Sequence, residues 1–459
     1  MKQKKNIGIF FDHDLTIRHF IKKNQFVELE KKFKVHYFFS NNKKRISTDL
    51  KKLKIHNFQK IEVDLTRKTK NIALDYFGRL NNALRKKNPQ FRYASIKLIK
   101  KQINSRRQFY FALLLIMTKT FNLYCWFLRK FKIKYNIYLE QLIKRYNLSC
   151  IIHPSVLSGD FVQDLVEIGN KNKIPTVLIM NSWDNCFSRA FTHGNPTKYF
   201  VWGKFVKSVA NKNLNLPKKN IESIGSAQFE IYKKKPKISS MQYRKLIGVK
   251  KNVPLVCYAG SNIGVNETKH LKIIDNELIK NKVNIKILYR PHPWKKFHKE
   301  EKNFFNENYK HIKIDYFSIS RYKNYFLKKP KKMSIVEANY DYTNTIIKSI
   351  DAVIAPISTF AIECALNKLP VAIYLPQLRK EYDLGFSTKT DYFSFLINLI
   401  KPIVCKSEDE LYKTVIKLHS FKNIKKIKNQ FQNNAKKIVL FDREKYTQKL
   451  QKKIKKLIN

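Results

Sequence analysis

The chain has 459 residues, 43% of them hydrophobic, which is enough for two ordinary domains with substantial cores. Its formal charge of +59 is typical of a protein that binds nucleic acid or an anionic membrane. However, Lys, Ile and Asn are abundant together throughout the chain, as the codons of an A/T-rich genome would produce, so charge alone does not name a partner. The six Cys residues lie far apart without CxxC or Cys/His spacing, which argues against disulfides and zinc.

A short apolar run at residues 7–11 predicts the first strand, and it lacks the long apolar region of a signal peptide. We therefore expect a cytoplasmic protein. Asp12, His13 and Asp14 follow, with Arg18 in the next turn. In a doubly wound domain this loop lies at the ligand edge of the sheet, so Asp12 or His13 could take a proton from a substrate hydroxyl. The alternative is that Asp12 or Asp14 caps the following helix.

Residues 35–40 and 61–65 predict two further strands, and a basic, helical insertion follows near 67–140. It contains the apolar runs 109–117 and 121–128, with Arg106, Arg107 and Lys119 beside them. A spanning helix needs about 20 mainly apolar residues, and Lys119 interrupts this stretch near its middle. Two interpretations remain: a helix in the interface of an anionic membrane, or a buried helical hairpin.

Regular α/β alternation returns with strands at 150–154, 174–180 and 199–203. The second of these runs into Trp183, Asp184 and Asn185. Trp183 could stack on a sugar face and Asp184 could bind hydroxyls, whereas the alternative is a turn whose Trp fills the core. A lysine-rich linker at 232–237 sets the expected boundary between a first domain, 1–235, and a second, 236–421.

The second domain begins with a strand at 253–259 that breaks at Gly260 and Ser261. This loop offers unhindered backbone N–H groups, but it matches neither a Walker loop nor a full GxGxxG, and a plain turn is the alternative. The next strand, 285–289, stops at Arg290 and His292. Residues 422–459 predict a basic C-terminal helix.

A strand at 351–356, a helix beginning at Ser358 and Thr359, and a strand at 371–375 form a βαβ unit. In open parallel sheets, ligands bind outside the carboxyl ends of the strands. A helix N-terminus with hydroxyls beside it is a natural phosphate site. The loop 376–392, with Arg379, Glu381 and Asp383, could close on a bound sugar.

Arg-Pro-His-Pro at 290–293, followed by Ser358, Thr359 and then Glu363, resembles the donor half of GT-B glycosyltransferases. The likeness is to the bacterial surface-polysaccharide and glycerophosphotransferase-like group. It implies an α/β fold of two Rossmann-like doubly wound domains facing a cleft. It also implies two sets of residues: donor-binding Gly260, Ser261, Arg290, His292, Ser358, Thr359 and Glu363, and on the acceptor side catalytic His13, Asp12 and Asp184 with acceptor-binding Arg18, Trp183 and Asn185.

We therefore expect transfer of a sugar from a nucleotide-activated donor to a surface-glycan or lipid-linked acceptor. No cofactor and no metal are expected, because fixed cations and a helix dipole can stand in for Mg²⁺. The expected partners include an anionic membrane surface, at the inner face of the cell membrane, but no specific nucleic acid. The alternatives are a nucleotide-sugar 2-epimerase or a polyol-phosphate transferase on the same fold, and a non-enzymatic basic nucleic-acid-binding protein.

Overall fold

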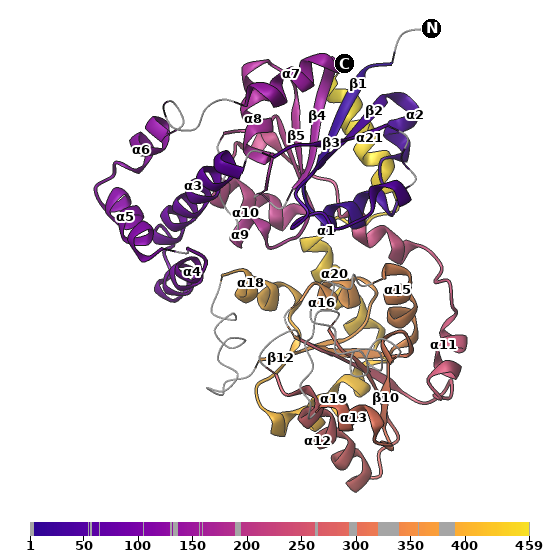
Figure 1. Cartoon of the computed structure of the whole chain (residues 1–459). Helices are drawn as coiled ribbons and strands as arrows, with labels where there is room; N and C mark the ends of the chain where they lie inside the picture. The colour runs from indigo at the N-terminus through magenta and orange to yellow at the C-terminus, as the bar shows by residue number, and fades with distance from the viewer. Residues whose placement is uncertain are drawn as a thin grey trace. The chain divides into compact units, whose positions relative to one another are not determined.

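The computed structural model divides into two compact units, each with its own parallel sheet (Figure 1). Unit 1 comprises Met1–Glu230 and Lys437–Asn459, and unit 2 comprises Ile231–Lys436. The structure describes residues 4–53, 55, 57–63, 65–103, 105–128, 131, 136–155, 157, 159–188, 194–261, 265–292, 301–319, 339–356, 358–375 and 391–458.

The sheet of unit 1 has seven parallel strands in the order β3-β2-β1-β4-β5-β6-β7. The order reverses between β1 and β4, which makes their carboxyl ends the topological switch point. The third strand lies at Phe58–Ile61 and not at 61–65, because helix α3 already begins at Leu65. The strands are β1 (Asn6–Phe11), β2 (Lys34–Ser40), β3 (Phe58–Ile61), β4 (Leu148–Ser155), β5 (Thr176–Met180), β6 (Lys198–Val201) and β7 (Ile221–Ser223).

Aromatic pairs cover both faces of this sheet. Phe10 stacks on Phe38 on one face, and Phe11 stacks on Phe39 on the other. A strand buried on both faces reads as a continuous apolar run, and helices must cover both faces of such a sheet. The covering helices are α1 (Asp14–Thr16) with a π-helical turn at Ile17–Ile21, α2 (Val27–Lys32), α7 (Ile137–Arg145), α8 (Val162–Lys171), α9 (Asn185–Ser188), α10 (Lys204–Leu214) and α21 (Tyr446–Ile458).

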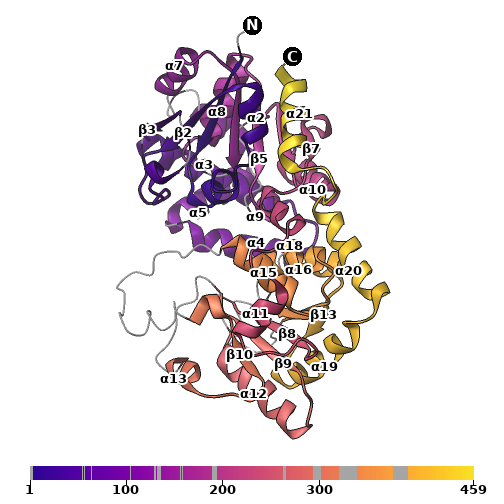
Figure 2. The same cartoon turned by 90° about the vertical axis from the view of Figure 1, so that its right-hand side faces the viewer.

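The C-terminal segment forms two helices, where the sequence predicted one. Helix α20 (Lys425–Ile438) ends beside Gly203, at which a Cβ would come within 2.5 Å of the Ile438 carbonyl. The amide of Leu440 then donates to the Trp202 carbonyl over 2.7 Å. Helix α21 follows and packs Tyr446, Leu450 and Ile454 into the core of unit 1 beside α2 (Figure 2). The chain therefore finishes in the unit in which it began.

The predicted insertion is helical, and it carries a small core of its own. Its helices are α3 (Leu65–Leu84), α4 (Pro89–Gln102), α5 (Arg106–Met117) and α6 (Phe121–Phe127). Phe77 and Leu80 of α3 pack in this core with Phe109 and Ala112 of α5. Among the described helices none is by itself long and apolar enough to cross a membrane, although α5 and α6, bent by 117°, meet that criterion jointly.

The sheet of unit 2 has six parallel strands in the order β10-β9-β8-β11-β12-β13, so its switch point lies between β8 and β11. The prediction of two parallel α/β domains is therefore confirmed. The strands are β8 (Leu255–Ala259), β9 (Lys286–Arg290), β10 (Ile312–Ile314), β11 (Ala352–Ala355), β12 (Val371–Tyr374) and β13 (Ile403–Cys405). The helices, besides α20, are α11 (Ser240–Leu246), α12 (Glu267–Lys280), α13 (Glu301–Asn306), α15 (Tyr340–Ser349), α16 (Thr359–Leu366), α18 (Asp391–Ile400) and α19 (Leu411–Phe421).

Candidate functional site

Two loops meet at the carboxyl edge of the unit 2 sheet. The Gly260 amide, just after β8, donates to the Arg290 carbonyl at the end of β9 over 2.8 Å. A Cβ on residue 260 would come within 2.9 Å of the His292 amide nitrogen and 2.6 Å of a Glu267 carboxylate oxygen. Glycine is therefore required for this close approach of backbone to backbone. The contact brings the predicted residues Gly260, Arg290 and His292 side by side.

The Arg290 side chain connects these loops to the helix after β11. Its guanidinium carbon lies 4.3 Å from the centroid of the Phe360 ring, and its Nη2 donates to Thr343 Oγ1 over 3.3 Å. Phe360 belongs to the first turn of α16, so a cation stands at the positive end of a helix dipole. Two positive elements therefore lie together at this edge, an arrangement that favours the binding of an anion.

Two hydroxyl residues stand at the N-terminus of α16. Ser358 occupies the N-cap position in an extended conformation. Within the described residues, its hydroxyl makes no capping hydrogen bond to the helix. Ser358 and Thr359 are both half-buried. The helix thus presents backbone N–H groups and two hydroxyls at one place.

Glu363 lies one turn further along α16 and is buried. Its Oε2 accepts a hydrogen bond from the Tyr232 hydroxyl over 2.7 Å. Burial and this carboxylate raise the pKa of Tyr232 well above its usual value, so the phenol stays protonated and donates. Part of the Glu363 carboxylate is therefore engaged inside unit 2, and its contact with a ribose stays a prediction.

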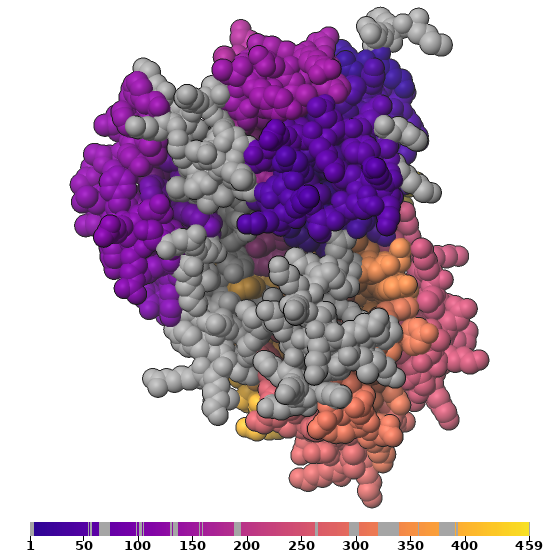
Figure 3. Space-filling model, viewed as in Figure 1, coloured from indigo at the N-terminus to yellow at the C-terminus, as the bar shows by residue number. Residues whose placement is uncertain are grey.

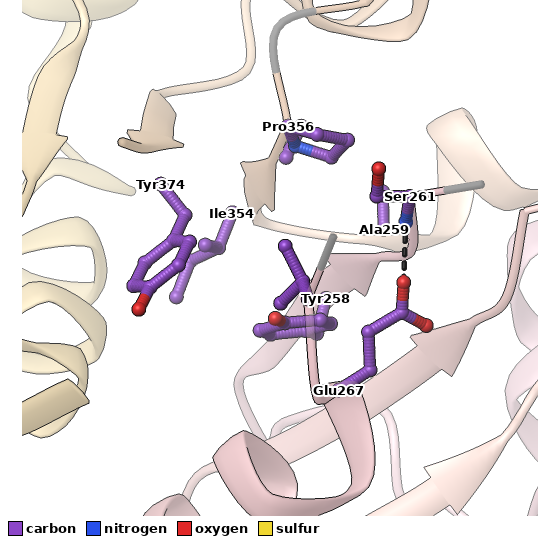
Figure 4. A pocket seen from close by; sticks show the side chains of 9 residues that line it. Tyr258, Ala259, Ser261, Glu267, Ile354, Pro356 and Tyr374 are labelled. Carbon is purple, nitrogen blue, oxygen red and sulfur yellow. Dashed lines mark hydrogen bonds between the residues drawn. The ribbon is translucent and has the colours of Figure 1, made fainter. Parts of the chain in front are cut away.

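A small hollow opens at the switch point of unit 2, between the ends of β8 and β11 (Figure 4). Glu267, the first residue of α12, lines the wall of this hollow. Its carboxylate accepts hydrogen bonds from the Ser261 amide and the Tyr289 hydroxyl, each over 2.5 Å. Glu267 was not among the site residues predicted from the sequence. The sequence did contain a signal for Glu267, because it is an acidic residue in the first turn of a helix that follows a Gly-Ser loop. The hollow is lined by Tyr258, Ala259, Ser261, Val265, Glu267, Ile354, Ala355, Pro356 and Tyr374.

In unit 1, Asp12 lies at the switch point and is only 1% exposed. Its Oδ2 accepts from the Asp160 amide over 2.7 Å, and His153 Nε2 lies 3.5 Å away. Burial raises the pKa of this carboxyl, but Arg45, His153 and the hydrogen bonds together outweigh it and hold the pKa well below its usual range. An enclosed carboxylate of such low basicity is a poor acceptor for a hydroxyl proton. The geometry therefore does not fit the expected role of Asp12 as a base.

His13 is the residue that caps α1, since its Nδ1 accepts from the Leu15 amide over 3.1 Å. The prediction of an aspartate cap at this helix was wrong. Asp14 instead accepts hydrogen bonds from the amides and hydroxyls of Ser47 and Thr48. His13 remains half-buried at the carboxyl edge, so its role as a base stays a prediction.

His19 was not identified from the sequence, and it lies beside predicted Arg18. Its Nε2 is 3.0 Å from Arg18 Nη2, and the side chain of Asn181, after β5, lies close to its ring. Burial, and then the charge of Arg18, lower the pKa of His19 well below its usual value. A neutral imidazole can accept the guanidinium hydrogen bond. Only the adjacent Arg18 gave a sequence signal for this histidine.

The loop after β5 is compact. Trp183 is 4% exposed and packs edge-on against Phe187, with ring centroids 6.2 Å apart. Asn185 Oδ1 accepts from the Ser182 amide over 2.8 Å, and Asp184 accepts from the Ser182 hydroxyl. These contacts favour the turn with a core-filling Trp over a Trp platform for a sugar. Asp184 is half-buried at this edge.

Two further expectations bear on the site. Arg379, Glu381 and Asp383, expected to close on a sugar, lie outside the described residues. Among the residues described, no group of three His, Cys, Asp or Glu side chains is placed to hold a metal ion.

Two doubly wound parallel sheets in one chain are the architecture of the GT-B fold. The comparison with solved structures agrees. A UDP-GlcNAc 2-epimerase from Neisseria meningitidis, solved with UDP-GlcNAc bound, has a TM-score of 0.52 at 8% identity, covering 98% of this chain and 100% of its own. At this identity the likeness is one of fold.

Other solved structures are similar with lower scores. A glycosyltransferase from Rickettsia africae has a TM-score of 0.46 at 13% identity, covering 99% of this chain and 98% of its own. The wall teichoic acid polymerase TagF has a TM-score of 0.46 at 11% identity, covering 100% of this chain and 90% of its own. No known family profile matches the sequence, and no curated protein matches it.

Proposed function

We propose that unit 2 binds the diphosphate of a nucleotide-activated sugar and that the protein transfers the sugar to an acceptor. The observation that carries the proposal is the convergence of Arg290 with the N-terminus of α16 through its contact with Phe360. A diphosphate supplies the negative charge that would relieve their mutual repulsion.

The chemistry follows from where charge develops. When the bond between the anomeric carbon and the phosphate oxygen breaks, negative charge grows on the leaving nucleoside diphosphate. Arg290 and the amides of the first turn of α16 stabilise that charge, and the hydroxyls of Ser358 and Thr359 donate to it. His292 contacts the same phosphates from the loop beside Gly260 in our proposal.

Fixed positive groups at this edge also support the proposal that no metal ion is needed. Arg290 and the helix dipole supply positive charge without Mg²⁺. A chelator should therefore leave turnover unchanged. If a chelator abolished turnover and added Mg²⁺ restored it, the proposal of a metal-independent reaction would be contradicted.

The acceptor side is proposed for the carboxyl edge of unit 1. We assign the proton acceptor to His13, with Arg18 as a binding residue, and we leave Asp12 and Trp183 out because both are enclosed. The acceptor class is a surface glycan or a lipid-linked precursor of one.

The test is donor binding by the full chain, measured by thermal shift across a panel of nucleoside diphosphates and then by calorimetry. His292→Ala should weaken binding of the best nucleotide, whereas His419→Ala should not. His419 is a matched control because it is half-buried in the same unit, and the charges acting on it are those of Lys422 and of Asp351, which precedes β11 at the opposite edge of the sheet. The absence of nucleotide binding, or wild-type affinity in His292→Ala, would overturn the assignment.

The same phosphate site would serve a nucleotide-sugar 2-epimerase, the activity named for the N. meningitidis structure. Incubation with donor alone separates the two, because an epimerase forms the epimer without an acceptor. A polyol-phosphate transferase would instead release a nucleoside monophosphate, since the bond broken lies between the two phosphates. A nucleic-acid-binding protein would show steeply salt-dependent RNA binding and no donor turnover.

A further inference from the structure

Exposed apolar side chains gather in the insertion of unit 1. Within the described part of the chain, eleven of the twenty exposed large hydrophobic residues lie between positions 93 and 138. We call seven of them, on two helices, the apolar face. They are Tyr110, Phe111, Leu114 and Met117 of α5 and Leu123, Trp126 and Phe127 of α6.

Helical spacing explains how this face forms. Tyr110, Leu114 and Met117 are spaced i, i+4 and i+7, so they share one side of α5. Phe109 and Ala112 lie on the other side and pack in the insertion's own core. A helix that is apolar on both sides normally has both sides covered, yet Met117 is 78% exposed and Leu123 64%.

The insertion stands at the side of unit 1 and away from its sheet, with α5 and α6 outermost (Figure 1). The space-filling view shows it in violet, reaching the molecular surface (Figure 3). The exposed fractions of its seven side chains leave the apolar face open to a large, extended partner.

The charge around the face identifies that partner. From residue 76 to residue 139 the sequence has fifteen Lys or Arg and no Asp or Glu. Arg106 and Arg107 are exposed at the start of α5, and Lys119 is exposed at the bend before α6. The ammonium of Lys100 lies 5.5 Å from the ring centroid of Phe109 and 5.6 Å from that of Tyr110. An apolar surface with a purely cationic fringe complements an apolar layer beneath an anionic one.

We propose that the apolar face inserts into the interface of an anionic lipid bilayer. Helix α5 has 12 residues and is about 18 Å long, shorter than the roughly 30 Å hydrocarbon core, which suits a helix lying in the interfacial plane. Tyr110 and Trp126 are residue types that favour this depth. A second copy of the chain would bring like charges together, so charge disfavours it as the occupant. The proposal does not depend on the sugar transfer proposed above.

The experiment is flotation of the full chain with vesicles of phosphatidylcholine containing phosphatidylglycerol, against pure phosphatidylcholine. The protein should float with the anionic vesicles, and high salt should weaken this binding. Met117→Glu should lower the partition coefficient about tenfold or more, because a large apolar side chain leaves the bilayer. Met241→Glu should leave it unchanged. Met241 is the matched control, a methionine 66% exposed on α11 of unit 2.

A second pair of variants tests how much the positive charges beside the apolar face contribute to vesicle binding. The double change Arg106→Glu and Arg107→Glu should reduce binding by roughly tenfold. Lys250→Glu with Lys251→Glu, an exposed pair in unit 2, should not. Brominated lipids should quench a fluorescence component that Trp126→Phe removes. Donor binding by thermal shift should stay unchanged in every variant, which separates this test from that of the transferase.

Several outcomes would overturn the proposal. They are no flotation with anionic vesicles, wild-type flotation by Met117→Glu, or equal loss in Met117→Glu and Met241→Glu. A dimer that Met117→Glu dissociates, without vesicle binding, would make a second copy the occupant. RNA binding that depends on Arg106 and Arg107, without vesicle binding, would make the partner a nucleic acid.

Discussion

The two sheets reverse their strand order in the same way, but the carboxyl edges of their switch points hold opposite electrostatic arrangements. In unit 1 the anionic Asp12 meets a guanidinium, an imidazole and a backbone amide, so its charge is compensated within the protein. In unit 2 the cationic Arg290 packs against Phe360 at the positive end of α16, and the Glu363 carboxylate on the same helix is hydrogen-bonded to Tyr232.

The difference shows why topology alone does not locate a ligand. A compensated buried carboxylate contributes to the fold, and losing one of its partners leaves a desolvated charge. Converging positive groups instead leave charge for a ligand to neutralise, and this costs the unliganded protein some stability. The same βα edge thus serves structure in one unit and, in our proposal, binding in the other.

The largest expected effect comes from removing the arginine at each edge. Arg290→Ala should weaken donor binding about 100-fold, because charge-assisted hydrogen bonds to phosphate contribute about 3 kcal/mol. Arg45→Ala should instead cost about 3 kcal/mol of folding stability, since it leaves Asp12 buried with less compensation. Calorimetry with the nucleotide and thermal unfolding measure the two effects. The comparison fails if Arg45→Ala weakens donor binding as strongly as Arg290→Ala does.

A second pair uses the glycines. A Cβ at Gly159 would lie 1.7 Å from Asp12 Oδ2, so Gly159→Ala should displace the carboxylate and cost about 1–3 kcal/mol of stability. Gly260→Ala should push the His292 loop away and raise the donor KM about tenfold, because the Cβ meets the His292 amide at 2.9 Å. Unfolding midpoints and steady-state kinetics check both. An unchanged donor KM in Gly260→Ala would separate this loop from the donor.

The buried strands could be predicted from sequence because each is an apolar run that ends at polar residues, as at 7–11 and 285–289. The third strand was misplaced because β3 lies at the edge of the sheet, where Phe58 is 37% exposed. Its position comes from pairing with residues 37–40 of β2, and no local pattern encodes that register.

The proximity of Gly260, Arg290 and His292 could be predicted because these residues follow strands directly, and parallel strands bring those positions together. The hydrogen bonds around Asp12 could not be predicted, because its partner Asp160 lies 148 residues away in the sequence. His13 was missed as a cap because histidine is not among the preferred N-cap residues, and two aspartates flank it. The burial of Trp183 against Phe187 also depends on tertiary packing. From sequence alone, a Trp after a strand could either stack on a sugar or fill the core.

A smaller effect is expected from the hydroxyls at α16. Thr359→Val keeps the shape and removes one donor to phosphate, so donor affinity should fall about fivefold. Thr268→Val, in the first turn of α12 in the same unit, is the control, since that hydroxyl bonds to Asn266. Nucleotide titration measures both. Equal affinities for the two variants would leave the α16 hydroxyls without a role in the anion site.

The smallest expected effect is on the pH dependence of stability, through His19 in unit 1. Because burial and Arg18 lower the pKa of His19, the folded protein keeps this imidazole neutral, whereas the unfolded chain protonates it near its usual pKa of about 6.5. Its contribution to stability is thus present above that pH and is lost as the pH falls below it. The wild type should lose about 2–4 °C more in Tm than His19→Gln between pH 7.5 and pH 5.5.

The difference between the two proteins isolates His19, because His36, His311 and His419 have lowered pKa values in both and cancel. Asp12 does not interfere, since its pKa lies far below this range. Identical pH profiles would mean that His19 is not held neutral by its surroundings. The loops after β1 and β5 would then be open to solvent and ions, and the contrast between a compensated edge in unit 1 and an anion site in unit 2 would lose this part of its support.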